Sequence, residues 1–283
     1  MAAGDAGAKE NVEIHMFRPN LDSLPDVQTP PGFSLRQGPD PAAWVAIQQA
    51  AEPFLNISLD GTQEGAWQHE FIPGEGNLPL CGEDGKPISL EDALRHQFFI
   101  VEESTGRAVG TATAWLTKHH AAYTDMLTTS RYWAASLTSP EGEAGPRQVD
   151  LNADGLVHWV AVHPEYQGRG LSKPLLAAVL QGLGSAGRCC KTATLGTGSG
   201  RPQAIPLYLS FGFEPMVFGA EDLRAWRELH RAAAARAALG EAADVDERTR
   251  RGDRVLVDKL RLVSETDVGR LLGVTEGSEA LKP

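Results

Sequence analysis

The residues with the clearest chemical potential stand in one short run, between an apolar segment and a segment with helical periodicity. The run, His163 to Lys173, reads HPEYQGRGLSK and contains Gly168 and Gly170. A glycine-bearing turn at the start of a helix exposes backbone N–H groups without partners inside the helix, and the helix dipole adds partial positive charge there. Such a turn can bind a phosphate or pyrophosphate, and its glycines let the ligand approach the backbone. The alternative is a tight strand-to-helix turn without a ligand.

Three blocks in this part of the chain resemble the GNAT acetyltransferase superfamily. Gln167 to Ser172 (QGRGLS) is similar to the Gln/Arg-x-x-Gly-x-Gly/Ala acetyl-CoA signature of that superfamily, with Ser172 at a position that usually holds Gly or Ala. The blocks Val160 to Pro164 (VAVHP) and Ala204 to Phe213 (AIPLYLSFGF) also resemble it. All three occur in the right order between Leu156 and Pro215.

The resemblance implies an α/β fold in which a mixed, partly splayed central sheet is flanked by helices. It also implies that acetyl-CoA is the acetyl donor and that its pantetheine arm pairs with the backbone around Val160 and Val162. A strand whose neighbour diverges leaves donors and acceptors open, and a ligand can complete them. No metal is expected. The residues expected to bind the cofactor are Val160, Val162, Gln167, Gly168, Arg169, Gly170, Leu171, Ser172 and Arg201.

Two residues are candidates for the proton transfers. Tyr208 stands at a position that resembles the general acid of many superfamily members, which protonates the departing CoA thiolate, but it can also be a core aromatic side chain on a helix. His158 can accept a proton from an amine near neutral pH, but it can also be a hydrogen-bonded histidine of the core. Some relatives carry a glutamate base near the start of this strand, where this chain has Leu156. Asp154 is a weaker candidate for the base.

Other motifs lack a feature that their chemistry requires. The segment Asp150 to Gly155 begins like a calcium-binding EF-hand, but the twelfth position is Ala161, which has no carboxylate. The run Gly196 to Arg201 lacks the final glycine of a dinucleotide-binding turn. The pairs His119-His120 and Cys189-Cys190 have no ligand spacing and no visible convergent partners, so we expect no zinc site there.

Periodicity predicts the elements that position these residues. A strand that alternates apolar and polar residues, an amphipathic helix opened by Asp40-Pro41 with Trp44 and Ile47 on its core face, and a hairpin come first. Strands then alternate with helices, which indicates a sheet with a parallel portion. The expected strands are Gly32–Gln37, Phe98–Glu103, Ala108–Leu116, Leu156–Val162, Lys191–Leu195 and Phe213–Phe218, and the later helices are Arg169–Leu183 and Pro202–Phe211.

The remaining segments are less regular. We predict three parts: an irregular N-terminal arm over residues 1–31, an acetyltransferase domain over 32–218 and a mostly helical extension over 219–283. The arm contains several prolines. Within the domain, Glu52 to Glu91 is expected to form surface loops that shape a site, and Ser139 to Pro146 has the composition of a mobile loop. The extension is expected to contain a helix ending at Gly240, a charged loop over Asp244–Asp253, a strand over Val255–Val263 and a last helix capped by Ser264 with Asp267.

Composition and charge narrow the range of functions. The chain has 283 residues, of which 42% are hydrophobic, and a formal net charge of −11, nearly all of it before Gly219. An acidic surface repels nucleic acid and favours a cationic small molecule or a basic peptide. Three cysteines do not make a disulfide scaffold, and no stretch reaches the roughly 20 apolar residues that a bilayer crossing requires. We therefore expect a cytoplasmic protein that binds neither nucleic acid nor membrane.

These observations together predict an N-acetyltransferase that passes the acetyl group of acetyl-CoA directly to the amine of a small molecule, which we expect to be cationic. One alternative is a regulatory module that binds an acyl-CoA without turnover, because Leu156 replaces the acid of some relatives. Another is an N-acetyltransferase that acts on a peptide or protein. The segment 219–283 can serve as a packing element or as a homodimer contact.

Overall fold

The computed structural model describes residues 12–74, 76–82, 85–130, 133–134, 148–184, 188–201, 203–239 and 245–265. The chain divides into two compact units. The first comprises Met1–Phe17, Arg131–Arg147 and Gly196–Pro283, and the second comprises Arg18–Ser130 and Gln148–Leu195. The predicted division at residues 31 and 218 stays a prediction.

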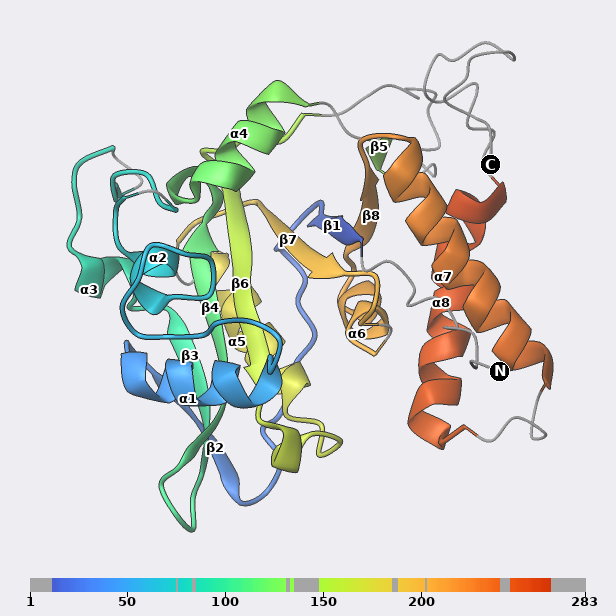
Figure 1. Cartoon of the computed structure of the whole chain (residues 1–283), viewed down its shortest axis with the longest axis horizontal. Helices are drawn as coiled ribbons and strands as arrows, with labels where there is room; N and C mark the ends of the chain where they lie inside the picture. The colour runs from blue at the N-terminus through green and yellow to red at the C-terminus, as the bar shows by residue number, and fades with distance from the viewer. Residues whose placement is uncertain are drawn as a thin grey trace, which may run out of the picture. The chain divides into compact units, whose positions relative to one another are not determined.

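The second unit contains a mixed β-sheet (Figure 1). Its strands β2 (Phe33–Gln37), β3 (Gln97–Glu102), β4 (Ala108–Leu116) and β6 (Asp154–Val162) are antiparallel neighbours in this order. The start of β7 (Thr192–Gly198) pairs with β6 in parallel. The predicted hairpin is therefore confirmed as β3 and β4, and the predicted parallel portion as β6 and β7. This mixed α/β sheet with an open edge is the fold class that the sequence predicted.

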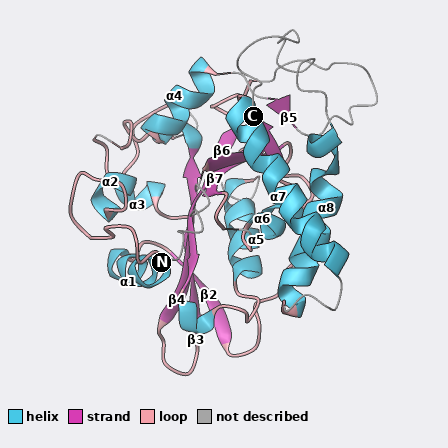
Figure 2. Cartoon of the chain, turned by 45° about the vertical axis from the view of Figure 1, so that its right-hand side comes forward, coloured by secondary structure: helices cyan, strands magenta, loops and turns pink. Residues whose placement is uncertain are grey.

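Helices cover both faces of this sheet. Helix α1 (Pro41–Ala51) contacts β4 and β6, and so does α5 (Ser172–Leu183). Figure 2 shows α1 on one side of the strands and α5 on the other. The carboxylate of Asp40 caps α1 by accepting a hydrogen bond from the N–H of Ala43 at 2.9 Å, as the sequence predicted. The apolar face of α5 is completely buried, which explains why this helix forms beside the strands.

The described residues of the segment Glu52–Glu91 form mainly loops, as the sequence predicted, but the segment also contributes to the core, so the prediction that it lies at the surface is wrong for Trp67, Phe71 and Leu80. It contains α2 (Trp67–Phe71) and the start of α3 (Leu90–Ala93). The ring of Phe71 packs edge-to-face on Trp44 of α1 and Trp115 of β4, with centroids 5.7 and 5.5 Å apart. The apolar residues of the segment are too widely spaced among glycines and prolines to produce a periodic pattern, so tertiary burial determines their structure. The short elements η1 (Thr117–His119), α4 (Ala121–Thr129) and η2 (Pro164–Tyr166) complete this unit.

The first unit contains three strands and three helices among its described residues. Strand β1 (Glu13–Arg18) pairs antiparallel with β8 (Glu214–Val217), which also pairs with β5 (Trp133–Ala134). The helices are α6 (Ile205–Ser210), α7 (Ala220–Leu239) and α8 (Glu247–Glu265). The prediction that residues 1–31 are irregular is wrong for β1, because Ile14 and Met16 alternate into the core and β8 supplies a partner strand.

The last helix also differs from the prediction. Residues 247–265 form α8, where the sequence suggested a charged loop followed by a strand over Val255–Val263. Asp246 begins the helix by accepting the N–H of Thr249 at 2.9 Å, and Leu256 and Leu260, one turn apart, are buried. Ser264 falls inside α8, whereas Asp267 and the segment Ser139–Pro146 lie outside the described residues. Among the described helices, none combines the length and apolar character needed to span a bilayer.

Candidate functional site

The centre of the second unit is a β-bulge in β6. Thr111 of β4 lies opposite Ala161 of β6, and Thr113 of β4 lies opposite His158. The one β4 residue between Thr111 and Thr113 therefore stands opposite two residues of β6, Trp159 and Val160. Trp159 has a φ of +49°, in the left-handed region that bulky residues rarely occupy. A bulge of this kind interrupts the ladder and redirects the backbone groups of the strand.

The bulge lies next to an open strand edge. The parallel pairing of β6 with β7 covers Asp154 to Leu156, and no β7 partner is recorded for the described β6 residues that follow. The backbone around Val160, which the sequence assigned to the cofactor, is on this open stretch. The carbonyl of Val162 accepts a hydrogen bond of 3.0 Å from Nε2 of Gln167, so one of its two acceptor positions is occupied. The pairing of β6 with β7 therefore ends before the stretch of β6 that the sequence assigned to the cofactor.

The turn after β6 has the geometry of an anion-binding site. Gly168 and Gly170 both have a φ of +80°, which glycine adopts without strain. In the described part of the chain, no acceptor is recorded for the backbone N–H groups from Gly168 to Ser172, where α5 begins. A Cβ on Gly170 would meet nothing within 4 Å, so backbone conformation rather than crowding requires glycine at this position. These N–H groups at the start of a 12-residue helix favour a phosphate oxygen.

Two arginine side chains contact residues at the start of this turn. The guanidinium of Arg169 lies 4.8 Å from the ring centre of Tyr166 and donates to the carbonyl of Glu165 at 3.2 Å. Arg107, from the β3–β4 turn, lies on the same ring at 5.9 Å, and the hydroxyl of Tyr166 donates to Glu102 at 3.1 Å. Arg107 also lies 3.7 Å from the carboxylate of Glu165, so acidic side chains offset part of the positive charge around the turn.

Arg201 and Tyr208 belong to the first unit. Arg201 is exposed, and its N–H donates to the carbonyl of Gly198 at 3.0 Å. Tyr208 lies in α6, is buried and packs edge-to-face on Phe213 with ring centroids 6.0 Å apart. Their expected roles, at a CoA phosphate and at the departing thiolate, stay predictions.

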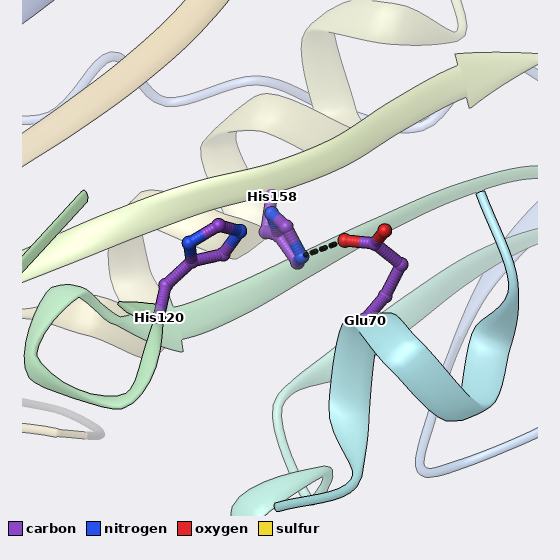
Figure 3. A group of neighbouring side chains, drawn as sticks. All are labelled: Glu70, His120 and His158. Atoms are coloured by element: carbon purple, nitrogen blue, oxygen red, sulfur yellow. Dashed lines mark ion pairs between the residues drawn. The ribbon is translucent and has the colours of Figure 1, made fainter. Parts of the chain in front are cut away.

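His158 belongs to a cluster that the sequence did not reveal. It lies beside Glu70 of α2 and His120, which precedes α4 (Figure 3). Nε2 of His158 is 3.4 Å from Oε2 of Glu70, and the rings of His158 and His120 are 5.2 Å apart in an edge-to-face arrangement. His158 and Glu70 are only 7% and 3% exposed. Three segments that are distant in the sequence therefore meet at the residue before the bulge.

The carboxylate of Glu70 is the most heavily contacted group of this cluster. Oε1 accepts the N–H of Gly65 at 3.0 Å and lies 3.0 Å from Nδ1 of His69. Oε2 accepts the indole N–H of Trp159 at 2.8 Å and faces His158. Burial raises the pKa of Glu70, but the hydrogen bond and charge of His158 and the N–H groups of Trp159 and Gly65 outweigh it and hold the pKa well below its usual range. The group is an ionised carboxylate in the core.

The spacing of the cluster is close to that of a metal site, but its lone pairs are engaged. One potential ligand atom from each of Glu70, His120 and His158 lies within 4.8 Å of the others. However, all four acceptor positions of the Glu70 carboxylate already face donors or ring nitrogens. Nδ1 of His120 lies 3.5 Å from the backbone nitrogen of Tyr123, at the outer limit of a hydrogen bond. A metal would have to displace these contacts.

The sequence predicted that no other potential metal ligands lie near the pair His119-His120. This is wrong for His120, which lies beside Glu70 and His158, whereas His119 has different surroundings. His119 is completely buried, and its Nε2 contacts the carbonyl oxygen of Cys81 at 2.8 Å. Burial lowers the pKa of His119 to about 4, so this ring is a neutral part of the core. The side chains of His119 and His120 therefore lie in different surroundings, which their adjacent positions in the sequence do not reveal.

The carboxylate of Asp154 is buried and hydrogen-bonded to side chains of neighbouring elements. Its carboxylate accepts hydrogen bonds from the hydroxyls of Thr117, Thr192 and Thr194 at 2.6, 2.6 and 2.8 Å. Burial raises the pKa of Asp154 to about 6, although these hydroxyls act in the opposite direction. The contacts join β6, β7 and η1 and occupy three of the four acceptor positions of the carboxylate, so a role for Asp154 as the base would have to displace them.

Comparison with known proteins gives one family match. Residues 95–215 match the family model of the acetyltransferase (GNAT) domain. This range includes the bulge, the open edge and the anion-binding turn, whereas Glu70 lies before it. A search of curated proteins finds no match to the chain.

Several solved structures are similar at low identity. A GCN5-related N-acetyltransferase from Sphaerobacter thermophilus is 18% identical with a TM-score of 0.44, and the match covers 73% of this chain and 50% of that one. A GCN5-related N-acetyltransferase from Kribbella flavida is 15% identical with a TM-score of 0.37, covering 73% and 55%. A tandem GNAT protein from the clavulanic acid biosynthesis pathway is 16% identical with a TM-score of 0.39, covering 74% and 51%. This chain spans about half of their length.

Proposed function

Residues 95–215 of this chain form an acetyltransferase domain of the GNAT superfamily, and from this premise we propose that the protein transfers an acetyl group from acetyl-CoA directly to the amine of a small molecule. The observation that carries the proposal is the row of N–H groups from Gly168 to Ser172 at the start of α5, which have no acceptor among the residues that the structure describes. They match the pyrophosphate of coenzyme A in charge and in hydrogen-bonding capacity.

The open edge of β6 supports the same cofactor. The pantetheine arm contains two amides, and an extended chain of this kind can pair with strand groups that have no neighbour. The bulge at Trp159 and Val160 then lies where the arm would end at the thioester. A backbone N–H there, such as that of Val160, can polarise the thioester carbonyl as negative charge develops on its oxygen.

The proton transfers are assigned to two side chains. His158, next to the bulge, accepts the proton of the acceptor amine, because only the neutral amine can attack the thioester. Tyr208 donates a proton to the departing thiolate. Direct transfer needs no covalent intermediate on the enzyme, since proximity of the two substrates supplies the main part of the rate enhancement.

A cationic acceptor is favoured by charge. The net charge of −11 favours an amine that arrives as an ammonium ion. We propose a small molecule of this kind as the acceptor class.

Two measurements test the function. Calorimetry with coenzyme A and with acetyl-CoA tests the cofactor site, and absence of binding to folded protein would refute the proposal. A thiol-release assay over small amines, amino acids and peptide N-termini then identifies the acceptor class. Tyr208→Phe and His158→Ala are expected to lower kcat while coenzyme A still binds, and unchanged rates in both would remove these role assignments.

A further inference from the structure

The Glu70 carboxylate connects two parts of the proposed site that are adjacent in β6. Through one oxygen it contacts both the indole N–H of Trp159, at 2.8 Å, and Nε2 of His158, at 3.4 Å. Trp159 carries the left-handed φ of the bulge, and His158 is the residue before it. One anionic group therefore contacts the side chain of a bulge residue and the side chain of the residue before it.

The position of the carboxylate is itself well fixed. Gly65 holds Oε1 at 3.0 Å, and the left-handed φ of Gly65, +90°, turns its N–H into the short α2 segment. Glu70 lies between Trp67 and Phe71, both of which are buried. The Glu70 carboxylate is 3% exposed, ionised and hydrogen-bonded at both oxygens. Burial of a charge costs free energy that its contacts with these partners must offset.

We propose that Glu70 is a positioning residue of the acetyl-transfer site, which holds the His158 ring with its Nε2–H toward the carboxylate and so presents Nδ1 as the proton acceptor. This inference rests on the proposed function for the identity of the proton donor. At 3.4 Å the contact is an ion-pair distance rather than a formed hydrogen bond, and among the described residues Nε2 of His158 has no hydrogen-bond partner; such contacts in sites without substrate commonly shorten when substrate binds.

The proton balance of the step is simple. An N–H bond of the acceptor ammonium breaks and an N–H bond to Nδ1 of His158 forms, which converts the imidazole to imidazolium and leaves a neutral amine. The negative charge of Glu70 stabilises that imidazolium, and the carboxylate itself stays ionised throughout. The amine nitrogen then has the lone pair with which it attacks the thioester carbonyl.

Nitrogen NMR of the histidine ring tests the inference without any acceptor. The tautomer of a neutral imidazole depends on the partner of each nitrogen, so the 15N shifts of His158 report whether Glu70 holds Nε2–H. We expect the Nε2–H form to dominate in the full chain at alkaline pH and this preference to be lost in Glu70→Gln. His158→Gln identifies the resonances, and Glu103→Gln, an exposed glutamate of the same unit, is the matched control that should change nothing.

The kinetic readout separates positioning from folding. With an acceptor from the amine screen, Glu70→Gln should lower kcat by about 10- to 100-fold, as supporting residues commonly do, while the KM for acetyl-CoA stays unchanged. Glu70→Asp keeps the charge but shortens the reach, so it should retain part of both the tautomer preference and kcat. This second variant also serves if Glu70→Gln does not fold.

Different outcomes overturn the inference and the proposed function. If the wild-type ring carries its proton on Nδ1, or if the tautomer is the same in Glu70→Gln, Glu70 does not position His158, even where coenzyme A binds. If coenzyme A does not bind, the function fails, whereas the tautomer result still decides the role of Glu70. Saturable binding of zinc chloride that His120→Ala abolishes would replace the positioning role with a metal site.

Discussion

The side-chain amide of Gln48 donates a hydrogen bond of 2.9 Å to the backbone carbonyl of Trp159. Gln48 is buried in α1, and the two residues are 111 positions apart in the sequence. The carbonyl at the bulge is therefore satisfied by a helix on the face of the sheet rather than by the neighbouring strand. The bulge is held from α1 by Gln48 and from α2 by Glu70, which makes it a supported feature of the fold.

Replacement of Gln48 should loosen this support. Gln48→Met keeps the side-chain volume but leaves the Trp159 carbonyl without its partner, so we expect a loss of about 1 to 3 kcal/mol in the free energy of unfolding. Thiol release should fall more than the affinity for coenzyme A. Gln49→Met, in the same helix, loses a hydrogen bond to the carbonyl of Ile57 and is the control whose turnover should not change. Equal turnover in both variants would show that the bulge does not depend on Gln48.

The two glycines with similar backbone angles give a matched pair. Gly170 in the anion-binding turn and Gly106 in the β3–β4 turn have φ values of +80° and +71°, and a Cβ would meet nothing within 4 Å at either position. Alanine at each should cost about 1 to 2 kcal/mol of stability, because left-handed backbone strains an L-residue. Only Gly170→Ala should also weaken coenzyme A binding. We expect its Kd to rise about tenfold or more, which corresponds to a loss of about 1.4 kcal/mol or more in binding free energy. Calorimetry that finds the same affinity in both variants would separate the turn from the cofactor.

The raised pKa of Asp154 predicts a specific pH dependence of stability. Its folded-state pKa of about 6 exceeds the ordinary value of 3.8, so the folded protein binds this proton more tightly than the unfolded chain does. The contribution is fully present below the unfolded pKa and is lost as the pH rises through the folded pKa. Between about pH 4 and 7, wild type should therefore lose up to about 3 kcal/mol relative to Asp154→Asn. Urea unfolding at several pH values measures this difference in the free energy of unfolding. Asp22 is exposed, so Asp22→Asn should show the same pH dependence of stability as wild type.

The ion pairs of α8 should differ in strength. Arg236 of α7 donates to both oxygens of Asp253, at 2.9 and 2.6 Å, and Asp253 is buried. Arg254 contacts Glu247 at 3.0 Å, but both side chains are largely exposed. We expect Arg236→Ala to cost about 1.5 to 3 kcal/mol because it strands a buried carboxylate, whereas Arg254→Ala should cost at most about 1 kcal/mol. Thermal unfolding compares them, and similar values would mean that burial does not strengthen the first pair.

The parts of the site that the sequence predicted are those determined by nearby residues. The turn from His163 to Ser172 depends on two glycines and a helix start that lie within ten positions, and the hairpin of β3 and β4 depends on one short connection. The apolar pattern of Leu156 to Val162 likewise predicted β6. Local signals of this kind are readable because the physical cause is in the same window of sequence.

The cluster around His158 could not be predicted in the same way. Glu70 and His120 come from segments without clear periodicity, and only the folded chain brings them to β6. One signal was present: an acid three positions after Trp67 and directly before Phe71 stands among residues suited to a core. Helix α8 was missed because the run from Val255 to Val263 satisfies both a two-residue and a helical period, and its pairing with α7 decides between them.

The location of Glu70 outside the family-matched range 95–215 has a practical consequence. On the proposed role of Glu70, a side chain from the stretch before that range orients His158, which lies within it, so a change confined to Glu70 should affect proton removal before it affects coenzyme A binding.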